Sequence, residues 1–253
     1  MKNQRLLIIM TVSFGLVIVL GVLGIGLNRS GQAEEAPLPT PILQYPDAPP
    51  TPTTPPKPTD APQTAATTLF QDDFASDASL DSWTFLDLEM VLPEYRSVWV
   101  IEAGTLNQDR TAAAGNPNFQ ETLAVTGPTS WTDYTITAKV SDQENVTFGL
   151  VARRQGDSFY RYRILEQESG AKQVLEKVVD GSVTPLVEVE GAGYERRRWY
   201  TMSLQVEGNT IQAVLDGEVV AEATDATLAQ GQAGLFTLAL GGVSFDDVTV
   251  TTP

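Results

Sequence analysis

Apolar and polar side chains alternate with a period of two along most of the chain beyond residue 68. In the segment TDYTITAKV, residues 132–140, every second position is apolar: Tyr134, Ile136, Ala138 and Val140. The segments 146–152, 160–164 and 200–206 repeat this alternation. Successive side chains of a β-strand point to opposite faces of the sheet, so this pattern predicts strands with one buried face.

Turn signals separate these segments along the chain. Short glycine-containing sequences that favour tight turns occur at 155–157, 180–181, 208–209, 216–217 and 241–242. About a dozen short strands at this spacing, without a convincing amphipathic helix, are typical of sandwiches. The sequence therefore predicts an all-β fold, an antiparallel β-sandwich of the jelly-roll type, over residues 69–253.

Two pairs of aspartates lie near the ends of this domain. In VSFDDVTV, the apolar positions 243 and 245 are odd-numbered, whereas the apolar positions 248 and 250 are even-numbered. The buried face must change phase across Asp246 and Asp247, which predicts a β-bulge there. In FQDDF, Asp72 shares its face with Phe70 and Phe74. A buried carboxylate at that position requires a partner, which is a backbone N–H group, an arginine or a hard cation.

The segments 146–153 and 159–165 predict a β-hairpin across the turn at 155–157. If the inward residues 148, 150 and 152 pair with residues 164, 162 and 160, a second set of side chains shares the opposite face. Four of these form a candidate ligand-binding stripe: Arg153, Phe159, Arg161 and Arg163. Guanidinium groups suit sugar hydroxyls or carboxylates, and aromatic rings suit the C–H face of a pyranose. The alternative is that these arginines pair across strands with Glu166, Glu168 or Glu176.

The first 33 residues predict a membrane anchor. Residues 6–27 contain no charged side chain, and at about 1.5 Å per residue they span roughly 30 Å of hydrocarbon. Lys2 and Arg5 precede this segment, so the positive-inside rule puts the N-terminus in the cytoplasm and the remaining chain outside. A cleaved signal peptide, ending at the small residues of 31–33, is the alternative. Both interpretations predict an extracytoplasmic domain, either at the cell membrane or secreted.

Residues 34–68 predict a disordered linker rich in proline and threonine. The sequence PLPTPILQYPDAPPTPTTPPKPTDAPQ, residues 37–63, lacks the apolar side chains needed to form a core and favours extended polyproline II. At about 3.1 Å per residue, such a segment holds a domain some tens of ångströms from a membrane. A proline-rich recognition ligand is the alternative, and a spacer is the simpler role.

Charge and composition exclude several classes of function. The 253 residues carry 16 Lys+Arg and 32 Asp+Glu, a formal net charge of −16. Four residues of each sign precede residue 64, so the whole acidic excess belongs to the predicted domain, which argues against nucleic acid as a partner. The chain has no cysteine and no histidine, which excludes thiol catalysis, disulfides and the commonest transition-metal ligands. The basic run 196–198 before Trp199 is interpreted as a solvated loop or the entry to a strand.

Short motifs along residues 69–251 resemble the concanavalin A-like lectin/glucanase superfamily. In chain order they are Trp99, Gly104-Thr105-Leu106, Asp133-Tyr134, Phe148-Gly149-Leu150-Val151-Ala152-Arg153, Tyr160, Trp199, Leu215-Asp216-Gly217, Gly231-Gln232-Ala233-Gly234-Leu235 and Phe245-Asp246-Asp247-Val248. They look most like the laminin-G-like and 3-keto-disaccharide hydrolase-type jelly rolls of secreted bacterial proteins. These motifs are mainly turn glycines and core aromatics, so the resemblance implies an architecture more than an activity.

The resemblance implies two features of the domain's ends. The first and last strands lie side by side in this superfamily, which would bring the two aspartate pairs together. A structural calcium is common in related sandwiches, and its ligands here would be Asp72, Asp73, Asp246 and Asp247. The alternative is that these carboxylates accept backbone N–H groups at the turn and the bulge.

The residues that a glucanase uses for catalysis are not found in their usual pattern. The glucanase branch carries an E-x-D-x-x-E run, and this chain has none. The pairs Glu188/Glu190 and Glu166/Glu168 are the nearest approach to two carboxylates that could act together. The sequence therefore favours a membrane-tethered, extracytoplasmic, non-catalytic module that binds carbohydrate. The alternatives are a glycoside hydrolase-like enzyme acting on disaccharides or glucans, and an adhesive or structural domain with a protein ligand.

Overall fold

A computed structural model describes residues 66–90, 92–110, 120–144, 146–165, 170–191, 193–239 and 241–253. The predicted membrane span 6–27, nearly all of the predicted linker, and Glu166 and Glu168 lie outside these ranges. Within the ranges, no helix has the length and apolar character needed to cross a bilayer. The chain divides at residue 60, and the second unit, residues 60–253, contains all the elements described below.

The second unit is built almost entirely of β-strands. Its described residues form fifteen strands and two 3-10 helices. In chain order they are β1 (Thr68–Asp72), η1 (Asp77–Ser82), β2 (Thr84–Asp87), η2 (Pro93–Tyr95), β3 (Val98–Glu102), β4 (Thr105–Arg110), β5 (Gln120–Thr126), β6 (Tyr134–Asp142), β7 (Thr147–Gln155), β8 (Ser158–Leu165), β9 (Lys172–Val179), β10 (Ser182–Glu190), β11 (Tyr200–Glu207), β12 (Thr210–Leu215), β13 (Glu218–Thr224), β14 (Gln232–Ala239) and β15 (Val243–Thr251).

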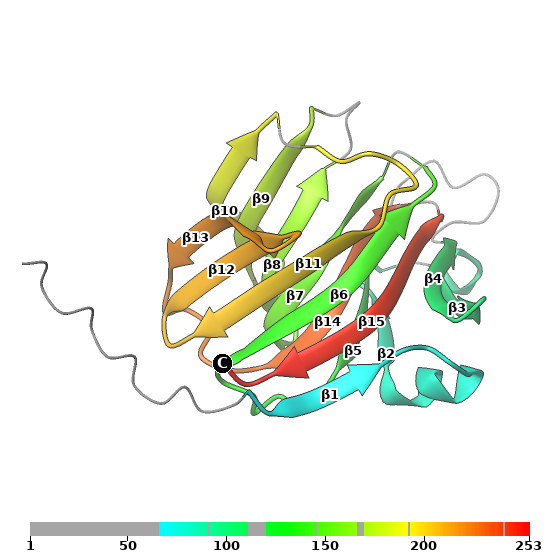
Figure 1. Cartoon of the computed structure of the whole chain (residues 1–253), viewed down its shortest axis with the longest axis horizontal. Coiled ribbons are helices and arrows are strands. Elements are labelled where there is room, and N and C mark those ends of the chain that lie inside the picture. The colour runs from blue at the N-terminus through cyan, green and yellow to red at the C-terminus, as the bar shows by residue number, and fades with distance from the viewer. Residues whose placement is uncertain are drawn as a thin grey trace, which may run out of the picture. The chain divides into compact units, whose positions relative to one another are not determined.

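The strands form two sheets that lie face to face (Figure 1). The eight-stranded sheet has the order β13-β12-β11-β6-β15-β4-β3, and β1 also pairs with β15. The seven-stranded sheet has the order β10-β9-β8-β7-β14-β5-β2. The ladders are antiparallel, including those between strands far apart in sequence such as β6 and β15. The predicted all-β antiparallel sandwich is therefore confirmed, and its two-sheet arrangement is consistent with a jelly roll.

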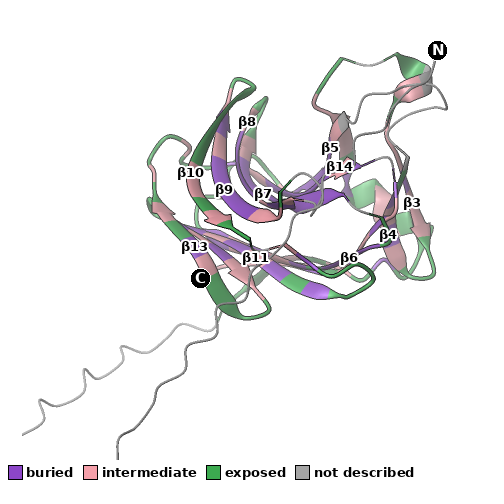
Figure 2. Ribbon diagram, turned by 90° about the horizontal axis from the view of Figure 1, so that it is seen from above, coloured by how far each residue is buried: buried purple, intermediate pink, exposed green. Residues whose placement is uncertain are grey.

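The main core lies between the two sheets. The alternating apolar residues of β6, from Tyr134 to Val140, are all buried, and so are the inward residues of β7, β8 and β11. Figure 2 shows this burial along the middle strands of both layers, whereas the turns are exposed. Burying one large apolar side chain contributes about 1.5–3 kcal/mol, so this continuous layer is the main stabilising feature of the domain.

The turns and the hairpin register follow the sequence prediction. Two-residue turns occupy 156–157, 180–181, 208–209 and 216–217, and residues 241–242 connect β14 to β15. Across β7 and β8, Phe148 pairs with Ile164 and Leu150 pairs with Tyr162. The predicted register of this hairpin is confirmed up to Ala152, where a bulge begins.

The two ends of the domain lie next to each other. β1 pairs with β15, and Thr67 and Thr252 exchange hydrogen bonds in which the backbone N–H of each donates to the other residue. In β15 the pairing with β6 shifts between Asp246 and Thr249, and Asp247 has a φ of 46°. The predicted adjacency of the chain ends and the predicted bulge are both confirmed.

Candidate functional site

Arg161 is fully buried and paired inside the domain. Its Nε donates to a carboxylate oxygen of Glu176 at 2.6 Å, and its Nη1 lies 3.0 Å from Glu121. The guanidinium carbon lies 4.2 Å from the ring centre of Phe236. Glu176 is directly opposite Arg161 across β8 and β9 and is also fully buried. Arg161 and Glu176 therefore form a cross-strand ion pair, which is the alternative to ligand binding that the sequence leaves open for these arginines.

Two further members of the predicted stripe lie on the same outer face of the seven-stranded sheet. Arg163 also contacts Glu176, at 2.9 Å, and its side chain is about one-fifth exposed (19%). Phe159 packs in a second apolar cluster with Val151, Val178 and Phe236 among others. Phe159 also lines a small hollow of about 190 Å³ between β8, β9, β10 and the segment after β2. Arg161 and Phe159 are buried and Arg163 is only partly exposed, so these three side chains offer little surface to a ligand.

Arg153 does not share the face of Arg161 and Arg163. It sits in the β7 bulge with a φ of 52°, and its backbone N–H donates to the hydroxyl of Tyr134 at 2.6 Å. Its guanidinium donates to the carbonyls of three loops, at Thr132, Gly208 and Leu228, and to Asp133. The bulge redirects the side chain, so the two-residue periodicity gives the wrong face for this residue. Arg153 therefore links these three loops to one another through hydrogen bonds.

The aspartates at the two domain ends share a shallow hollow of about 440 Å³. Gln71, Asp72, Asp73, Asp247, Val248 and Thr249 line it. Asp72 accepts the backbone N–H of Phe74 on one oxygen and the indole N–H of Trp83 on the other, both at 2.9 Å. Asp73 accepts the N–H of Ala75, and Asp247 pairs with Lys139 at 2.5 Å.

These residues do not fit a calcium site. Asp246 accepts a backbone N–H from its neighbour Asp247, so each carboxylate already has a local partner at the turn or the bulge. Calcium binds six to eight oxygens that converge on one point. Among the residues that the structure describes, no group of three or more acidic side chains converges in this way. Asp72, Asp73 and Asp246 accept backbone N–H groups, as in the alternative, whereas Asp247 pairs with Lys139.

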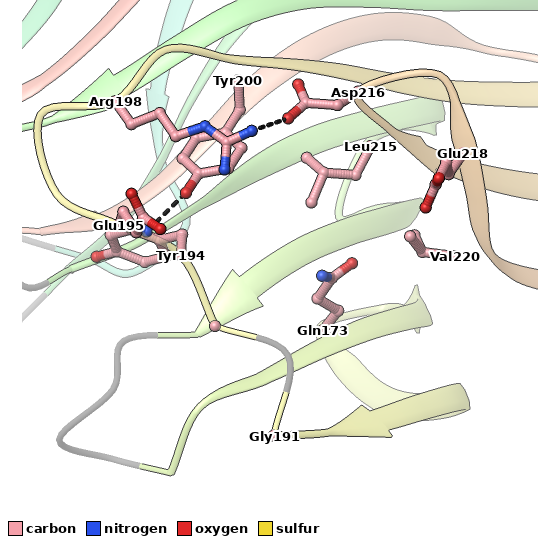
Figure 3. Close-up of a pocket in the computed structure, with 11 residues that line it drawn as sticks. Gln173, Gly191, Tyr194, Glu195, Arg198, Tyr200, Leu215, Asp216, Glu218 and Val220 are labelled. Carbon is pink, nitrogen blue, oxygen red and sulfur yellow. Dashed lines mark hydrogen bonds and ion pairs between the residues drawn. The ribbon is translucent and has the colours of Figure 1, made fainter.

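A larger cleft opens where the edges of the two sheets approach each other. β13 contacts β9 and β10, and the loop between β10 and β11 lies beside them. The cleft has a volume of about 630 Å³ (Figure 3). Its lining residues are Gln173, Gly191, Gly193, Tyr194, Glu195, Arg198, Tyr200, Leu215, Asp216, Glu218 and Val220. A few polar groups converge there on a concave surface, as is usual for ligand sites.

One wall of the cleft is an ordered ion pair. Arg198 donates to Asp216 at 2.7 Å, and its guanidinium carbon lies 4.4 Å from the ring centre of Tyr200. The other oxygen of Asp216 accepts the backbone N–H of Thr201 at 2.9 Å. The Tyr200 hydroxyl accepts the backbone N–H of Glu195 at 2.6 Å. Both the loop and the β12–β13 turn are therefore fixed to the start of β11.

The floor of the cleft rests on a buried carboxyl group. Tyr194 packs on Phe148 at 4.7 Å between ring centres, and its hydroxyl lies 3.0 Å from Asp142. Burial raises the pKa of Asp142 to about 6, and the Tyr194 hydroxyl opposes this rise. The backbone carbonyl of Asp142 accepts the N–H of Arg197. Asp142 therefore supports the loop that lines the cleft.

Gln173 brings an uncharged polar group into the cleft. Its side-chain oxygen accepts the hydroxyl of Tyr162 at 2.6 Å, and the residue is only 5% exposed. Figure 3 shows its amide pointing from β9 into the space below Leu215. Among the described residues, no hydrogen-bond acceptor is paired with its Nε2. This amide N–H group is available to a ligand.

The sequence does not single out the residues of this cleft. The run 196–198 is exposed, as predicted for a solvated loop, but Arg198 turns onto Tyr200 and Asp216. Asp216-Gly217 is predicted as a turn and as part of a fold motif, but the link between this turn and the loop depends on tertiary structure. Of the carboxylates considered for catalysis, Glu188 pairs with Lys172 at 3.2 Å and neither Glu188 nor Glu190 lines the cleft.

Solved structures with the same fold are recognisable at low sequence identity. The carbohydrate-binding module CBM66 from Bacillus subtilis aligns with a TM-score of 0.51 and 17% identity over 67% of this chain and 94% of its own. A B. subtilis protein of unknown function with a galectin-like fold aligns with a TM-score of 0.56 and 11% identity, over 73% of this chain and 96% of its own. A β-glucanase from Bacillus licheniformis aligns with a TM-score of 0.51 and 12% identity, over 73% of this chain and 97% of its own. At these identities the likeness concerns the fold alone.

The sequence itself matches one family. No curated protein sequence matches the chain significantly. The family profile described as galactocerebrosidase, C-terminal lectin domain, matches residues 115–253, which is more than half of the chain and runs from before β5 to the C-terminal end of the domain. Together with the two-sheet fold, this match shows that the chain belongs to the galactocerebrosidase C-terminal lectin domain family, within the concanavalin A-like lectin/glucanase superfamily.

Proposed function

We propose that this protein is a carbohydrate-binding module whose ligand occupies the cleft between β9, β13 and the β10–β11 loop. The family to which it belongs is described as a lectin domain, and one structural relative is a carbohydrate-binding module. The single observation that carries the proposal is the cleft itself, in which buried and charged polar groups converge beside apolar side chains. A pyranose has the same mixture of hydroxyl groups and apolar C–H faces.

The lining residues suit a sugar in chemical detail. The Gln173 N–H group and the carboxylates of Glu195 and Glu218 offer one donor and several acceptors to hydroxyl groups. Leu215 and Val220 supply apolar surface between them.

The module is proposed to be non-catalytic. The chain lacks the E-x-D-x-x-E run of the glucanases and has no histidine. Release of reducing sugar from mixed polysaccharides by the wild-type chain would contradict this part of the proposal. Loss of that activity in Glu188→Gln or Glu190→Gln would then identify the carboxylates responsible.

The domain is proposed to act outside the cytoplasm, held to the membrane by residues 6–27 through the proline-rich segment. The support is the uncharged stretch of 22 residues preceded by Lys2 and Arg5. A tether of this kind suits a module that binds polymers near the cell surface.

A glycan array with the full chain in mild detergent tests the binding proposal. We expect a limited set of glycans to bind with micromolar to millimolar affinity, typical of a shallow cleft. Glu218→Trp places a bulky ring at the cleft and should abolish binding. Val219→Trp changes the neighbouring exposed residue, which does not line the cleft, and should leave binding intact. A folded wild-type chain that binds no glycan, or two variants that behave alike, would overturn the proposal.

A further inference from the structure

One residue, Asp142, contacts both ends of a segment that lines the cleft. Asp142 is the last residue of β6, and it is only 1% exposed. Its carboxyl oxygen Oδ2 lies 3.0 Å from the hydroxyl of Tyr194, and its backbone carbonyl accepts the N–H of Arg197 at 2.8 Å. The segment 194–197 runs between these two contacts, and its residues Tyr194 and Glu195 line the cleft (Figure 3). Asp142 therefore holds this segment in place.

The hydroxyl of Tyr194 has one proton and two oxygens that compete for it. The backbone N–H of Val146 donates to the hydroxyl at 2.8 Å, and the backbone carbonyl of Val146 lies 2.5 Å from it. The carboxyl group of Asp142 is the second oxygen partner. A hydroxyl group donates one hydrogen bond and accepts two. All three contacts are hydrogen bonds only if the hydroxyl donates to the Val146 carbonyl and a protonated Asp142 donates to the hydroxyl.

The surroundings of Asp142 also favour its neutral form. Its second carboxyl oxygen, Oδ1, is buried and has no hydrogen-bond partner among the residues that the structure describes. Its cross-strand neighbour on β15 is the apolar Val243. Burial raises the pKa of Asp142 to about 6; the Tyr194 hydroxyl and Arg196 of the loop oppose this rise, and Glu144 of the turn after β6 adds to it. Geometry and electrostatics therefore agree that the closed segment holds a protonated carboxyl group.

Loss of this proton breaks the arrangement. An ionised Asp142 can only accept hydrogen bonds, so it competes with the Val146 carbonyl for the single proton of Tyr194. Whichever oxygen loses is left buried without a donor, which costs free energy. A movement of Tyr194 that admits water to the carboxylate relieves this cost. The same movement displaces Tyr194 and its neighbour Glu195 from the cleft that they line.

We propose that Asp142 is a pH-sensitive switch for the cleft. When Asp142 is protonated, the segment 194–197 is closed and the cleft binds its ligand; when Asp142 is ionised, the segment opens and binding weakens. Asp142 does not line the cleft, so it is a positioning residue that acts through Tyr194 and the backbone of Arg197. This inference rests on the proposed function and concerns the regulation of that same site. Such a module holds carbohydrate in mildly acidic surroundings and releases it more readily near neutral pH.

The two protonation equilibria set the size of the effect. In the open segment Asp142 meets water and its pKa returns to the usual 3.8, compared with about 6 in the closed segment. The closed form is therefore fully favoured below pH 3.8, and this advantage is lost as the pH rises through about 6. Between pH 5 and pH 7 the equilibrium constant for opening should rise about tenfold. Apparent affinity depends on the fraction of closed molecules, so it should fall by about twofold to tenfold.

Hydrogen exchange of backbone amides tests the switch without any ligand. The amides of Arg197 and Val146 are followed by NMR in the full chain in mild detergent, because their acceptors are Asp142 and Tyr194. After correction for the intrinsic exchange rate, opening at both amides should rise about tenfold from pH 5 to pH 7 in the wild type. Asp142→Asn should show no such rise, because its amide N–H group can donate to the Tyr194 hydroxyl at either pH. Glu144→Gln, an exposed change on the adjoining turn, is the matched control and should keep the rise.

A glycan array probed at pH 5 and at pH 7 tests the link to the cleft. The chains compared are the wild type, Asp142→Asn and Glu144→Gln. For the glycans that bind at pH 5, the apparent affinity of the wild type and of Glu144→Gln should be about twofold to tenfold lower at pH 7. The affinity of Asp142→Asn should be the same at both pH values.

The outcomes separate the switch from the proposed function. Glycan binding by the wild type that is equal at pH 5 and pH 7 overturns the regulation and leaves carbohydrate binding intact. A fall in affinity that is just as large in Asp142→Asn shows that another group titrates, and overturns the assignment to Asp142. A folded wild-type chain that binds no glycan at either pH removes the proposed function, and the regulation of binding with it. If Asp142→Asn does not fold, exchange in the wild type decides, and opening that stays constant from pH 5 to pH 7 overturns the switch.

Discussion

Glu176 connects two arginines in a cluster with almost no access to water. It accepts from Arg161 at 2.6 Å and lies 2.9 Å from Arg163, and its own side chain is fully buried. Buried charges are tolerated because each has a partner of opposite sign, and their mutual attraction offsets the lost hydration. The cost appears when one partner is removed, because the other charge stays buried without compensation.

We expect Glu176→Gln to lower the free energy of unfolding by about 3–5 kcal/mol, since it leaves Arg161 buried with only Glu121 nearby. The control is Glu188→Gln, which removes a partly exposed pair with Lys172 and should cost about 0–1 kcal/mol. Urea denaturation of both variants gives the comparison. Equal losses would mean that the buried cluster contributes no more than a surface pair.

Asp142 makes stability depend on pH. Burial raises its pKa from the usual 3.8 to about 6, so the folded state holds the proton more tightly than the unfolded state does. The resulting stabilisation is present below pH 3.8 and is lost as the pH rises to about 6. One pKa unit corresponds to about 1.4 kcal/mol, so the whole effect is about 3 kcal/mol.

Asp142→Asn removes this titration while keeping the shape of the side chain. Relative to wild type, the variant should gain about 3 kcal/mol of stability between pH 4 and pH 7, measured by urea denaturation at each pH. Glu102→Gln, an exposed change at the end of β3, should show no such trend. A stability difference between Asp142→Asn and wild type that is constant over this range would contradict the raised pKa.

At the scale of the element, the alternation of side chains predicted the strands and their buried faces, because packing between two sheets requires one apolar face on each strand. The rule worked at the β15 bulge, where the apolar residues change from odd to even positions across the aspartate pair. The rule failed at Arg153. A bulge in β7 changes the direction of this side chain, but no apolar residue after the bulge is out of phase, so the sequence does not reveal the bulge. Arg161 and Phe159 on the outer face of the seven-stranded sheet are also buried. Alternation alone does not predict this burial, because it indicates only which side chains share a face.

Gly149 lets β7 approach β8 closely. A Cβ atom at this position would lie 2.1 Å from the backbone oxygen of Tyr162 and 2.9 Å from the Cα of Arg163. Gly149→Ala must therefore separate two hydrogen-bonded strands and should cost about 3 kcal/mol in thermal or urea unfolding. Gly156→Ala, in the adjoining turn at a φ of 57°, meets open space and should cost only about 1 kcal/mol. Similar losses at both positions would rule out close strand approach as the reason for Gly149.

For the whole molecule, the sequence predicted the sandwich and the adjacency of its ends more fully than it predicted the cleft. Fold depends on many repeated signals, such as turn glycines and alternating apolar residues, and no single one decides it. The cleft depends on a few side chains from β9, the β10–β11 loop and the β12–β13 turn. These segments come together only when the edges of the two sheets approach each other, so their chemistry is not visible in any one stretch of sequence.

The proposed tether makes a prediction about the full chain in cells. Because residues 6–27 are uncharged and follow Lys2 and Arg5, the full chain should sediment with membranes, and added protease should remove its C-terminal domain from outside. Leu16→Arg combined with Val19→Arg puts two charges near the centre of the span, each costing about 2.5–3.5 kcal/mol on insertion, and should release the chain from the membrane fraction. Residues 60–253 alone, expressed in the cytoplasm, should stay soluble and resist the external protease. A mature chain that begins after Ala33 by mass spectrometry would instead show a cleaved signal peptide, and the domain would then act as a secreted protein.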